Sequence, residues 1–100
     1  MVIYVSAVGD TCTLDLQGRL TAADAPQLQA ELAKNMKNAS TVVLDCENLE
    51  YIASAGLRQL MIAEKYMEAK KGALILKHVN ENVMMVLEET GFDTILTVEK

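Results

Sequence analysis

Two runs rich in hydrophobic residues in the first fifth of the chain predict β-strands. They are Val2–Val8 and Thr11–Leu16, and Gly9-Asp10 between them is a pair that favours a tight turn. In the second run, apolar and polar residues alternate, which predicts one buried face and one face in water. We therefore expect an opening hairpin, and we expect the chain to leave the strand over Gln17–Thr21.

A helical period begins next. Asp24 is positioned to cap a helix, and Pro26 falls in its first turn, where a missing N–H costs little. The apolar residues at helical spacing predict one buried stripe, formed by Ala25, Leu28, Leu32 and Met36. A loop over Asn38–Ser40 then leads to the next strand.

The run Val42–Leu44 is short, apolar and mostly β-branched, which is typical of a strand covered on both faces. Asp45 ends the run, and Cys46 to Tyr51 is expected to form a tight connection. Small and apolar residues follow, and the chain turns helical from Leu57. Ser54 therefore lies at the start of a helix.

This second helix is expected to end near Lys70, with Gly72 as its terminator. Its predicted core side is made of four residues on one face, Gly56, Leu60, Ala63 and Met67. Two interpretations remain for Met61 and Ile62. Either they widen the apolar face that packs on the sheet, or one of them stays exposed in a partner-binding patch.

In the last third of the chain, strands and helices again alternate. Ala73–Val79 is an apolar run and predicts a parallel neighbour of the central strand. Asn80 or Asn82 can cap a short helix that Gly91 closes, and its apolar residues are Val83, Val86 and Leu87. Phe92–Val98 predicts a final short strand.

The order of these elements indicates an α/β fold, with one mixed sheet and helices packed mainly on one face. One hundred residues, 51% of them apolar, suffice for one domain over residues 1–100. A net charge of −5 and scarce aromatic residues argue against nucleic acid and anionic membranes as partners. The chain shows neither a membrane-spanning run nor a leader pattern, so we expect a cytoplasmic protein.

Few residues of the chain are candidates for catalysis or for binding a metal or cofactor. Cys12 and Cys46 lie in apolar strand patterns without a metal-site spacing, which predicts two buried free thiols. His78, the only histidine, is expected to be a solvated strand-end residue. We find no nucleophile–base pair, metal cluster or phosphate-binding glycine loop, so we expect no enzyme and no cofactor. An enzyme that used Asp45 and Ser54 would need a base or metal ligands beside them.

Ser54 allows two interpretations: it is only the N-cap of the helix, or it is a site of phosphorylation. The first backbone N–H groups of a helix lack partners and carry partial positive charge. A serine hydroxyl can cap these donors, and a phosphoryl group on that serine would find a favourable site for an anion. Phosphorylation adds about −1.5 to −2 charges, enough to decide whether a partner docks on a small surface.

The segment VVLDCENLEYIASAGLRQLM resembles the signature of the STAS domain family, the anti-sigma factor antagonists and their relatives. In that family a strand ending in Asp precedes a loop and a segment of the Asp-Ser-Ser-Gly-Leu or Ser-Ser-Ala-Gly-Leu type. Its first serine is the usual phosphorylation site. Ser54 falls on that phosphoacceptor, Asp45 on the strand-end Asp, and Gly56 and Leu57 on the Gly-Leu pair.

Three positions depart from the commonest pattern. Ala53 stands where Asp or Ser is frequent, and Ala55 stands where a second Ser is frequent. The segment Gln17–Thr21 is similar to a Gly-Glu-Leu-Asp or Gly-Arg-Leu-Asp stretch of the family, with Thr21 in place of the last Asp. The resemblance covers nearly the whole chain, in order.

The resemblance implies a STAS domain that acts as an anti-sigma factor antagonist. The unphosphorylated form would bind an anti-sigma factor, usually a serine kinase, and so free a sigma factor. Phosphorylation of Ser54 by that kinase would break the complex, and a serine phosphatase would restore binding. The implied partner-binding residues are Thr21, Asp24, Asp45, Ser54, Ala55, Gly56, Leu57, Arg58 and Met61. The alternative is a STAS scaffold or regulatory subunit of another assembly, such as a stress-signalling or lipid-transport complex, without a phospho-switch.

Overall fold

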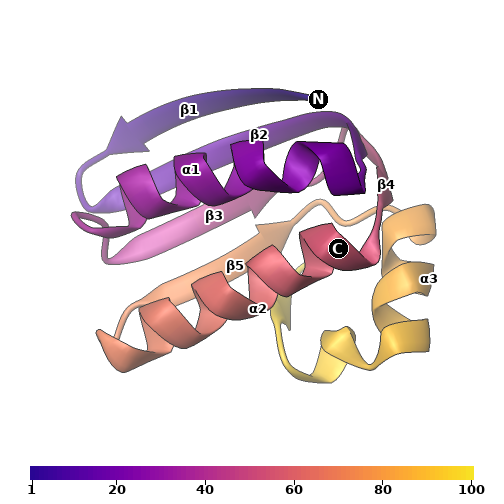
Figure 1. Cartoon of the computed structure of the whole chain (residues 1–100). Helices are drawn as coiled ribbons and strands as arrows, with labels where there is room; N and C mark the ends of the chain where they lie inside the picture. The colour runs from indigo at the N-terminus through magenta and orange to yellow at the C-terminus, as the bar shows by residue number, and fades with distance from the viewer.

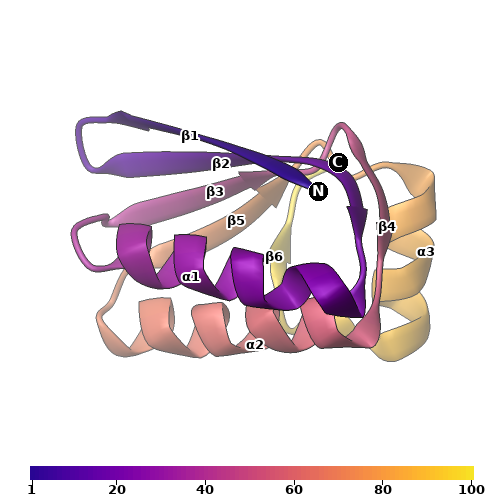
Figure 2. The same ribbon diagram turned by 45° about the horizontal axis from the view of Figure 1, so that its top comes forward.

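A mixed sheet with helices on one face forms the frame of the protein (Figures 1 and 2). The computed structural model describes all residues, 1–100. The order of elements confirms the predicted α/β architecture. The elements are β1 (Val2–Val8), β2 (Thr11–Leu20), the 3-10 helix η1 (Ala22–Asp24), α1 (Ala25–Met36), β3 (Thr41–Asp45), β4 (Leu49–Ile52), α2 (Ser54–Ala69), β5 (Ala73–Lys77), α3 (Glu81–Thr90), the 3-10 helix η2 (Phe92–Thr94) and β6 (Thr97–Val98).

The sheet runs in the order β1-β2-β3-β5-β6, and only the β1–β2 hairpin is antiparallel. Each parallel step needs a crossover, and α1 and α2 provide two of them. These two helices lie side by side on one face of the sheet, whereas α3 covers the end of the molecule beside β4 (Figure 2). As predicted, β5 is the parallel neighbour of β3.

Strand β2 is longer than the pattern of its residues indicated. The chain was expected to leave the strand over 17–21, but it bends at Gly18, whose φ is +101°, and continues to Leu20. There it pairs with β4, with a register shift between Gly18 and Arg19. The prediction of a tight connection over Cys46 to Tyr51 was therefore wrong, because Leu49–Ile52 forms a strand on this extension.

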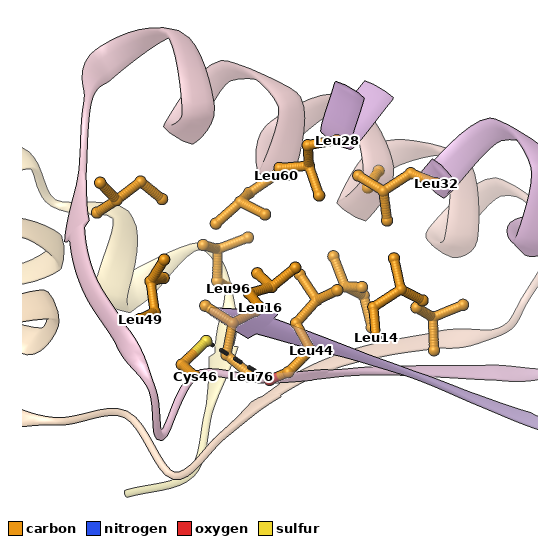
Figure 3. Packing of buried hydrophobic residues seen from close by; sticks show 14 of the residues in the cluster. Leu14, Leu16, Leu28, Leu32, Leu44, Cys46, Leu49, Leu60, Leu76 and Leu96 are labelled. Carbon is orange, nitrogen blue, oxygen red and sulfur yellow. Dashed lines mark hydrogen bonds between the residues drawn. The ribbon is translucent and has the colours of Figure 1, made fainter. Parts of the chain in front are cut away.

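A single cluster of buried apolar side chains fills the space between the sheet and the helices (Figure 3). The predicted stripes of α1 and α2 are both buried. Leu28, Leu32 and Leu60 point from the helices toward Leu14 and Leu44 of the sheet. Burial of a leucine side chain is worth about 1.5–3 kcal/mol, so this aliphatic layer is the main stabilising term of the fold.

The termini of α3 agree with the sequence, because Asn80 accepts a hydrogen bond from Val83 N–H at 3.0 Å and Gly91 takes a φ of +80°. The predicted start of α1 after Asp24 and the predicted end of α2 near Lys70 are confirmed, but the capping groups predicted there were wrong. The Asp24 side chain does not cap α1, and Lys71, not Gly72, adopts the left-handed conformation after α2, with a φ of +63°. Gly72 is instead required for space, since a Cβ there would lie 2.7 Å from the carbonyl oxygen of Ser40.

The C-terminal segment is only partly extended. A strand was predicted over Phe92–Val98, but Phe92–Thr94 forms a 3-10 helix and only Thr97–Val98 pairs with β5. Leu96, between them, is buried in the core and holds the segment against the sheet. None of the helices combines the length and apolar character that a transmembrane segment requires.

Candidate functional site

Ser54 is the first residue of α2 and is exposed to solvent. The N-cap position belongs to Ala53, whose backbone is extended and whose N–H donates to the carbonyl oxygen of Leu20 at 2.8 Å. No side chain caps the helix, so the interpretation of Ser54 as an N-cap was wrong. Its hydroxyl is left without a hydrogen-bond partner within the protein.

The first turn of α2 offers free backbone donors next to this hydroxyl. The first intrahelical bond runs from Leu57 N–H to the carbonyl oxygen of Ala53, at 3.0 Å. The N–H groups of Ser54, Ala55 and Gly56 therefore have no partner inside the helix. The turn carries no acidic residue that would oppose an anion. Free donors and the positive end of the helix dipole together favour negative charge at this position.

The absence of a side chain at Gly56 lets α2 approach the end of β2. A Cβ on Gly56 would lie 2.7 Å from the side chain of Leu20 and 3.2 Å from that of Ile52. Leu20 and Ile52 are register partners in the β2–β4 pair. Through this contact the helix start is held beside the segment that follows Leu20, and η1 contacts α2 directly.

Asp24 is the charged residue of that neighbouring segment. Its Oδ2 accepts hydrogen bonds from the Thr21 hydroxyl at 2.6 Å and the Thr21 N–H at 3.0 Å, and its Oδ1 accepts one from the amino group of Met1 at 3.0 Å. These donors, the Thr21 hydroxyl foremost, lower the pKa of Asp24 from 3.8 to about 2. Asp24 is therefore ionised at neutral pH.

The implied partner-binding residues fall into four groups, of which Asp45 is one by itself. Thr21, Asp24, Ser54, Ala55 and Arg58 lie at one end of the helical layer, and Ser54 and Arg58 are the exposed members. Gly56 and Leu57 are buried, so they support the first turn of α2 from within. Met61 is half-buried one turn further along α2.

Asp45 lies at a different place. It ends β3, and its Oδ1 contacts Nδ1 of His78 and accepts a hydrogen bond from Glu47 N–H, each at 3.1 Å. None of its hydrogen bonds reaches α2. His78 is exposed, as predicted, but its φ of +56° is unusual for a residue with a side chain. Only part of the signal for this pair was available from the sequence: it predicted that the two strands are neighbours, but not the register that brings Asp45, at the end of β3, beside His78, which follows β5.

Sequence reasoning also missed Arg19 and Tyr51. The guanidinium carbon of Arg19 lies 4.6 Å from the centroid of the Tyr51 ring, in a cation–π contact across the β2–β4 pair. These residues are register partners on two strand segments that the sequence did not predict. Their contact reinforces the strand pair that carries the chain into α2.

The two thiols are buried and free, as predicted. Burial, and then the charge of Asp45, raises the pKa of Cys46 to about 12, and burial also raises the pKa of Cys12. No group of three or more His, Cys, Asp or Glu side chains is arranged to hold a metal ion. The site therefore consists of an exposed hydroxyl, free backbone donors and a fixed carboxylate.

Comparison with known proteins shows the family of the chain. A family model described as Mlab, STAS domain, matches residues 3–98. The chain belongs to the STAS domain family. It is 42% identical over 84 residues to the provisionally named anti-sigma factor antagonist BtrV of Bordetella bronchiseptica, an alignment that covers 83% of this chain and 72% of BtrV.

Solved structures show the same fold. The anti-sigma factor antagonist SpoIIAA in its unphosphorylated form superposes with a TM-score of 0.84 at 20% identity, over 99% of this chain and 89% of SpoIIAA. The Bacillus cell fate determinant SpoIIAA in its phosphorylated form gives a TM-score of 0.76 at 19% identity, over 99% and 92% of the two chains. The identity to BtrV thus places the chain in the anti-sigma factor antagonist family, and the SpoIIAA structures show that it shares their fold.

Proposed function

We propose that this protein binds an anti-sigma factor through the surface around Ser54, and that phosphorylation of Ser54 ends the binding. The unmodified chain binds the anti-sigma factor, and the sigma factor that the anti-sigma factor had held is then free. The partner is a serine kinase that modifies Ser54, and a serine phosphatase removes the phosphoryl group. In this scheme the chain is ligand and substrate and supplies no catalytic residue.

One observation carries the proposal: the Ser54 hydroxyl is exposed and lacks a protein partner, directly beside the free N–H groups of the first turn of α2. A kinase needs an accessible nucleophile, and the product needs a place where an anion is tolerated. Both conditions are met at this residue. The relationship to BtrV and the two forms of SpoIIAA support an antagonist with a phosphoserine state.

The chemical step transfers the γ-phosphoryl group of ATP to the Oγ atom of Ser54. The Oγ–phosphorus bond forms, the bond to the leaving ADP breaks, and the hydroxyl proton passes to a base of the kinase. The new group brings about −1.5 to −2 charges. Its oxygens can accept from the free N–H groups, and Arg58, one turn further along the helix, lies at the spacing of an ion-pair partner.

The added charge would end binding for two reasons. A partner surface complementary to a neutral hydroxyl would have to desolvate a dianion. Asp24, already ionised on the neighbouring segment, adds negative charge at the same end of the helical layer. Neither effect needs a change of fold.

The test compares two exposed serines. Ser54→Asp and Ser40→Asp add the same charge, but Ser40 lies in the loop before β3, at the opposite end of the helices. Binding is measured by calorimetry against a kinase-type anti-sigma factor purified from the same cells. We expect Ser54→Asp to weaken binding by at least ~30-fold, the loss associated with an unpaired charge in an interface, and Ser40→Asp to leave it within about threefold. Equal binding by both variants, with unchanged circular dichroism, would contradict the proposal.

A further inference from the structure

The two helices of the helical layer leave an apolar groove on their outer side. Helices α1 and α2 run in the same direction and lie side by side (Figure 2). The groove between them has a volume of about 220 Å³. Both helices contribute lining residues, and six of the nine are hydrophobic.

The wall on the α2 side is made of two large apolar residues that the core does not use. Ile62 is 49% exposed and Tyr66 is 42% exposed. They are four residues apart and therefore lie one above the other on the same helix face. The exposed apolar residue of the α1 side is the small Ala33, and buried residues such as Leu32 and Ala63 also line the groove. An apolar strip thus remains open to water.

The charge around the groove is opposite to that of the whole chain. The protein has a net charge of −5, yet none of the lining residues is acidic and one, Lys37, is basic. At the same end, Lys70 Nζ donates to the carbonyl oxygens of Met36 and Lys37 at 2.7 and 3.0 Å, and it lies 5.8 Å from the centroid of the Tyr66 ring. Its hydrogen bonds hold this cation beside Lys37 and the Tyr66 ring, next to the groove.

The dimensions favour a helix over a small molecule. Pockets for small ligands usually enclose about 300–1,000 Å³, more than is present here. The α2 side of the groove runs from Gln59 to Tyr66, ~10 Å at 1.5 Å per residue, which is about two helical turns. An amphipathic helix that lies in a groove places apolar anchors at i and i+4 spacing, which matches the spacing of Ile62 and Tyr66.

We propose that this groove binds an acidic amphipathic α-helix of a partner protein. Two apolar residues of that helix, one turn apart, pack on Ile62 and Tyr66. A carboxylate of the helix pairs with Lys37 and Lys70, and the side-chain amides of Gln29 and Gln59 hydrogen-bond its polar flanks. This site extends along α2 beyond Met61, and its occupation requires neither the phosphorylation of Ser54 nor an anti-sigma factor.

The test uses a synthetic amphipathic peptide of about 16 residues, with leucines at i and i+4 spacing and glutamates on both flanks. Its counterpart carries lysines in place of the glutamates. Each peptide is titrated into the full chain labelled with 15N, and the backbone amide shifts are followed by NMR. We expect saturable shifts in α1 and α2 with the acidic peptide, and at least ~10-fold weaker binding of the basic peptide, which is 1.4 kcal/mol.

Substitutions in the groove test where the acidic peptide binds. Ile62→Asp and Lys37→Glu change exposed residues and are each expected to weaken the acidic peptide by at least ~10-fold. Met85→Asp is the matched control, because Met85 is 56% exposed on α3, away from the groove, and it should bind like the original chain. Unchanged binding after both groove substitutions would overturn the proposal.

Four further outcomes would also overturn it. Equal binding of the acidic and basic peptides would mean that the groove does not select its ligand by charge. If the amide shifts do not saturate, the groove does not bind a helix. Concentration-dependent self-association that Ile62→Asp abolishes, measured by sedimentation, would assign the groove to a second copy of the chain. Binding to anionic lipid vesicles that Lys37→Glu abolishes would assign it to a membrane surface.

Discussion

Gly56 at the start of α2 lies directly against Leu20 at the end of β2, so closely that a Cβ on Gly56 would be 2.7 Å from two carbon atoms of the leucine side chain. Leu20 is fully buried and has little room to move. The position of Ser54 relative to Thr21 and Asp24 therefore depends on the missing side chain at residue 56.

Gly56→Ala is expected to destabilise the protein. The added methyl group meets Leu20 at 2.7 Å and Ile52 at 3.2 Å, and overpacking of this kind costs about 1–3 kcal/mol. The better helix propensity of alanine offsets up to about 1 kcal/mol of this cost. Urea unfolding should show a net loss of about 1 kcal/mol or more. A variant as stable as the original chain would mean that Leu20 can move aside.

A double-mutant cycle checks the cause of that loss. Leu20→Ala alone opens a cavity and is expected to cost about 2–5 kcal/mol. In the Leu20→Ala background the methyl group of Gly56→Ala has space, so its cost should disappear and the two changes should not be additive. Additive costs would place the strain elsewhere in the first turn of α2.

Thr21→Val is expected to raise the pKa of Asp24. The substitution removes the hydroxyl donor 2.6 Å from the carboxylate, which is the first cause of its lowered pKa. In the original chain the pKa should be near 2, and in the variant it should move toward 3.8 when the carboxyl carbon is titrated by NMR. Thr97→Val, on the exposed strand β6, is the control and should leave the pKa of Asp24 unchanged.

The same pKa shift predicts a pH dependence of stability. Because the folded state lowers the pKa of Asp24, its contribution is present above pH 3.8 and is lost as the pH falls through about 2. Unfolding experiments between pH 4 and 2 should show a smaller slope for Thr21→Val than for the original chain. An identical slope would indicate that the amino group of Met1 and the backbone N–H of Thr21 suffice to lower the pKa.

His78→Gly and His78→Ala separate backbone strain from the contact with Asp45. Both variants lose the hydrogen bond to Asp45, but only glycine adopts the φ of +56° without steric cost. A side chain in this conformation costs roughly 1–2 kcal/mol, so the glycine variant should be more stable than the alanine variant by about 1 kcal/mol. Equal stability would mean that the loop relaxes when the imidazole is removed.

The buried thiols are expected to react slowly in the native protein. Thiol reagents attack the thiolate, and burial raises the pKa of Cys46 to about 12. In a Cys12→Ala variant at pH 8, Cys46 should react with a disulfide reagent only as fast as the protein opens, and rapidly in urea. Stability should also fall as the pH rises from 9 toward 12, because the unfolded thiol ionises first. Rapid reaction of the folded chain would contradict the burial of Cys46.

The periodic elements could be predicted because their own residues encode them. The buried stripes of α1 and α2, and the apolar run of β3, repeat at the helix or strand period. Strand β4 could not be predicted in this way. Two exposed residues separate its buried ends, Leu49 and Ile52, and its partner is the part of β2 beyond the bend at Gly18. Its formation depends on a contact between segments about thirty residues apart, which no local pattern contains.

The candidate site, too, has features that the local sequence encodes and features that depend on contacts between distant segments. The sequence placed Ser54 at a helix start because small residues and a new helical period meet there. It did not reveal that Ala53 takes the N-cap position and leaves the serine hydroxyl free, since this depends on the pairing of Ala53 with Leu20. The Asp45–His78 contact joins residues 33 positions apart and follows from strand register, which becomes known only when β3 and β5 are paired.

The most direct test of the Ser54 switch is the mass of the protein recovered from its native cells, with fragmentation that locates any modification. Ser6 and Ser40 are also exposed and serve as internal controls in the same molecule. The account predicts one phosphoryl group, on Ser54, in a fraction that changes with growth conditions. A chain that stays unmodified at Ser54 under every condition, or carries the group on Ser6 or Ser40 instead, would contradict the account and favour a constitutive scaffold.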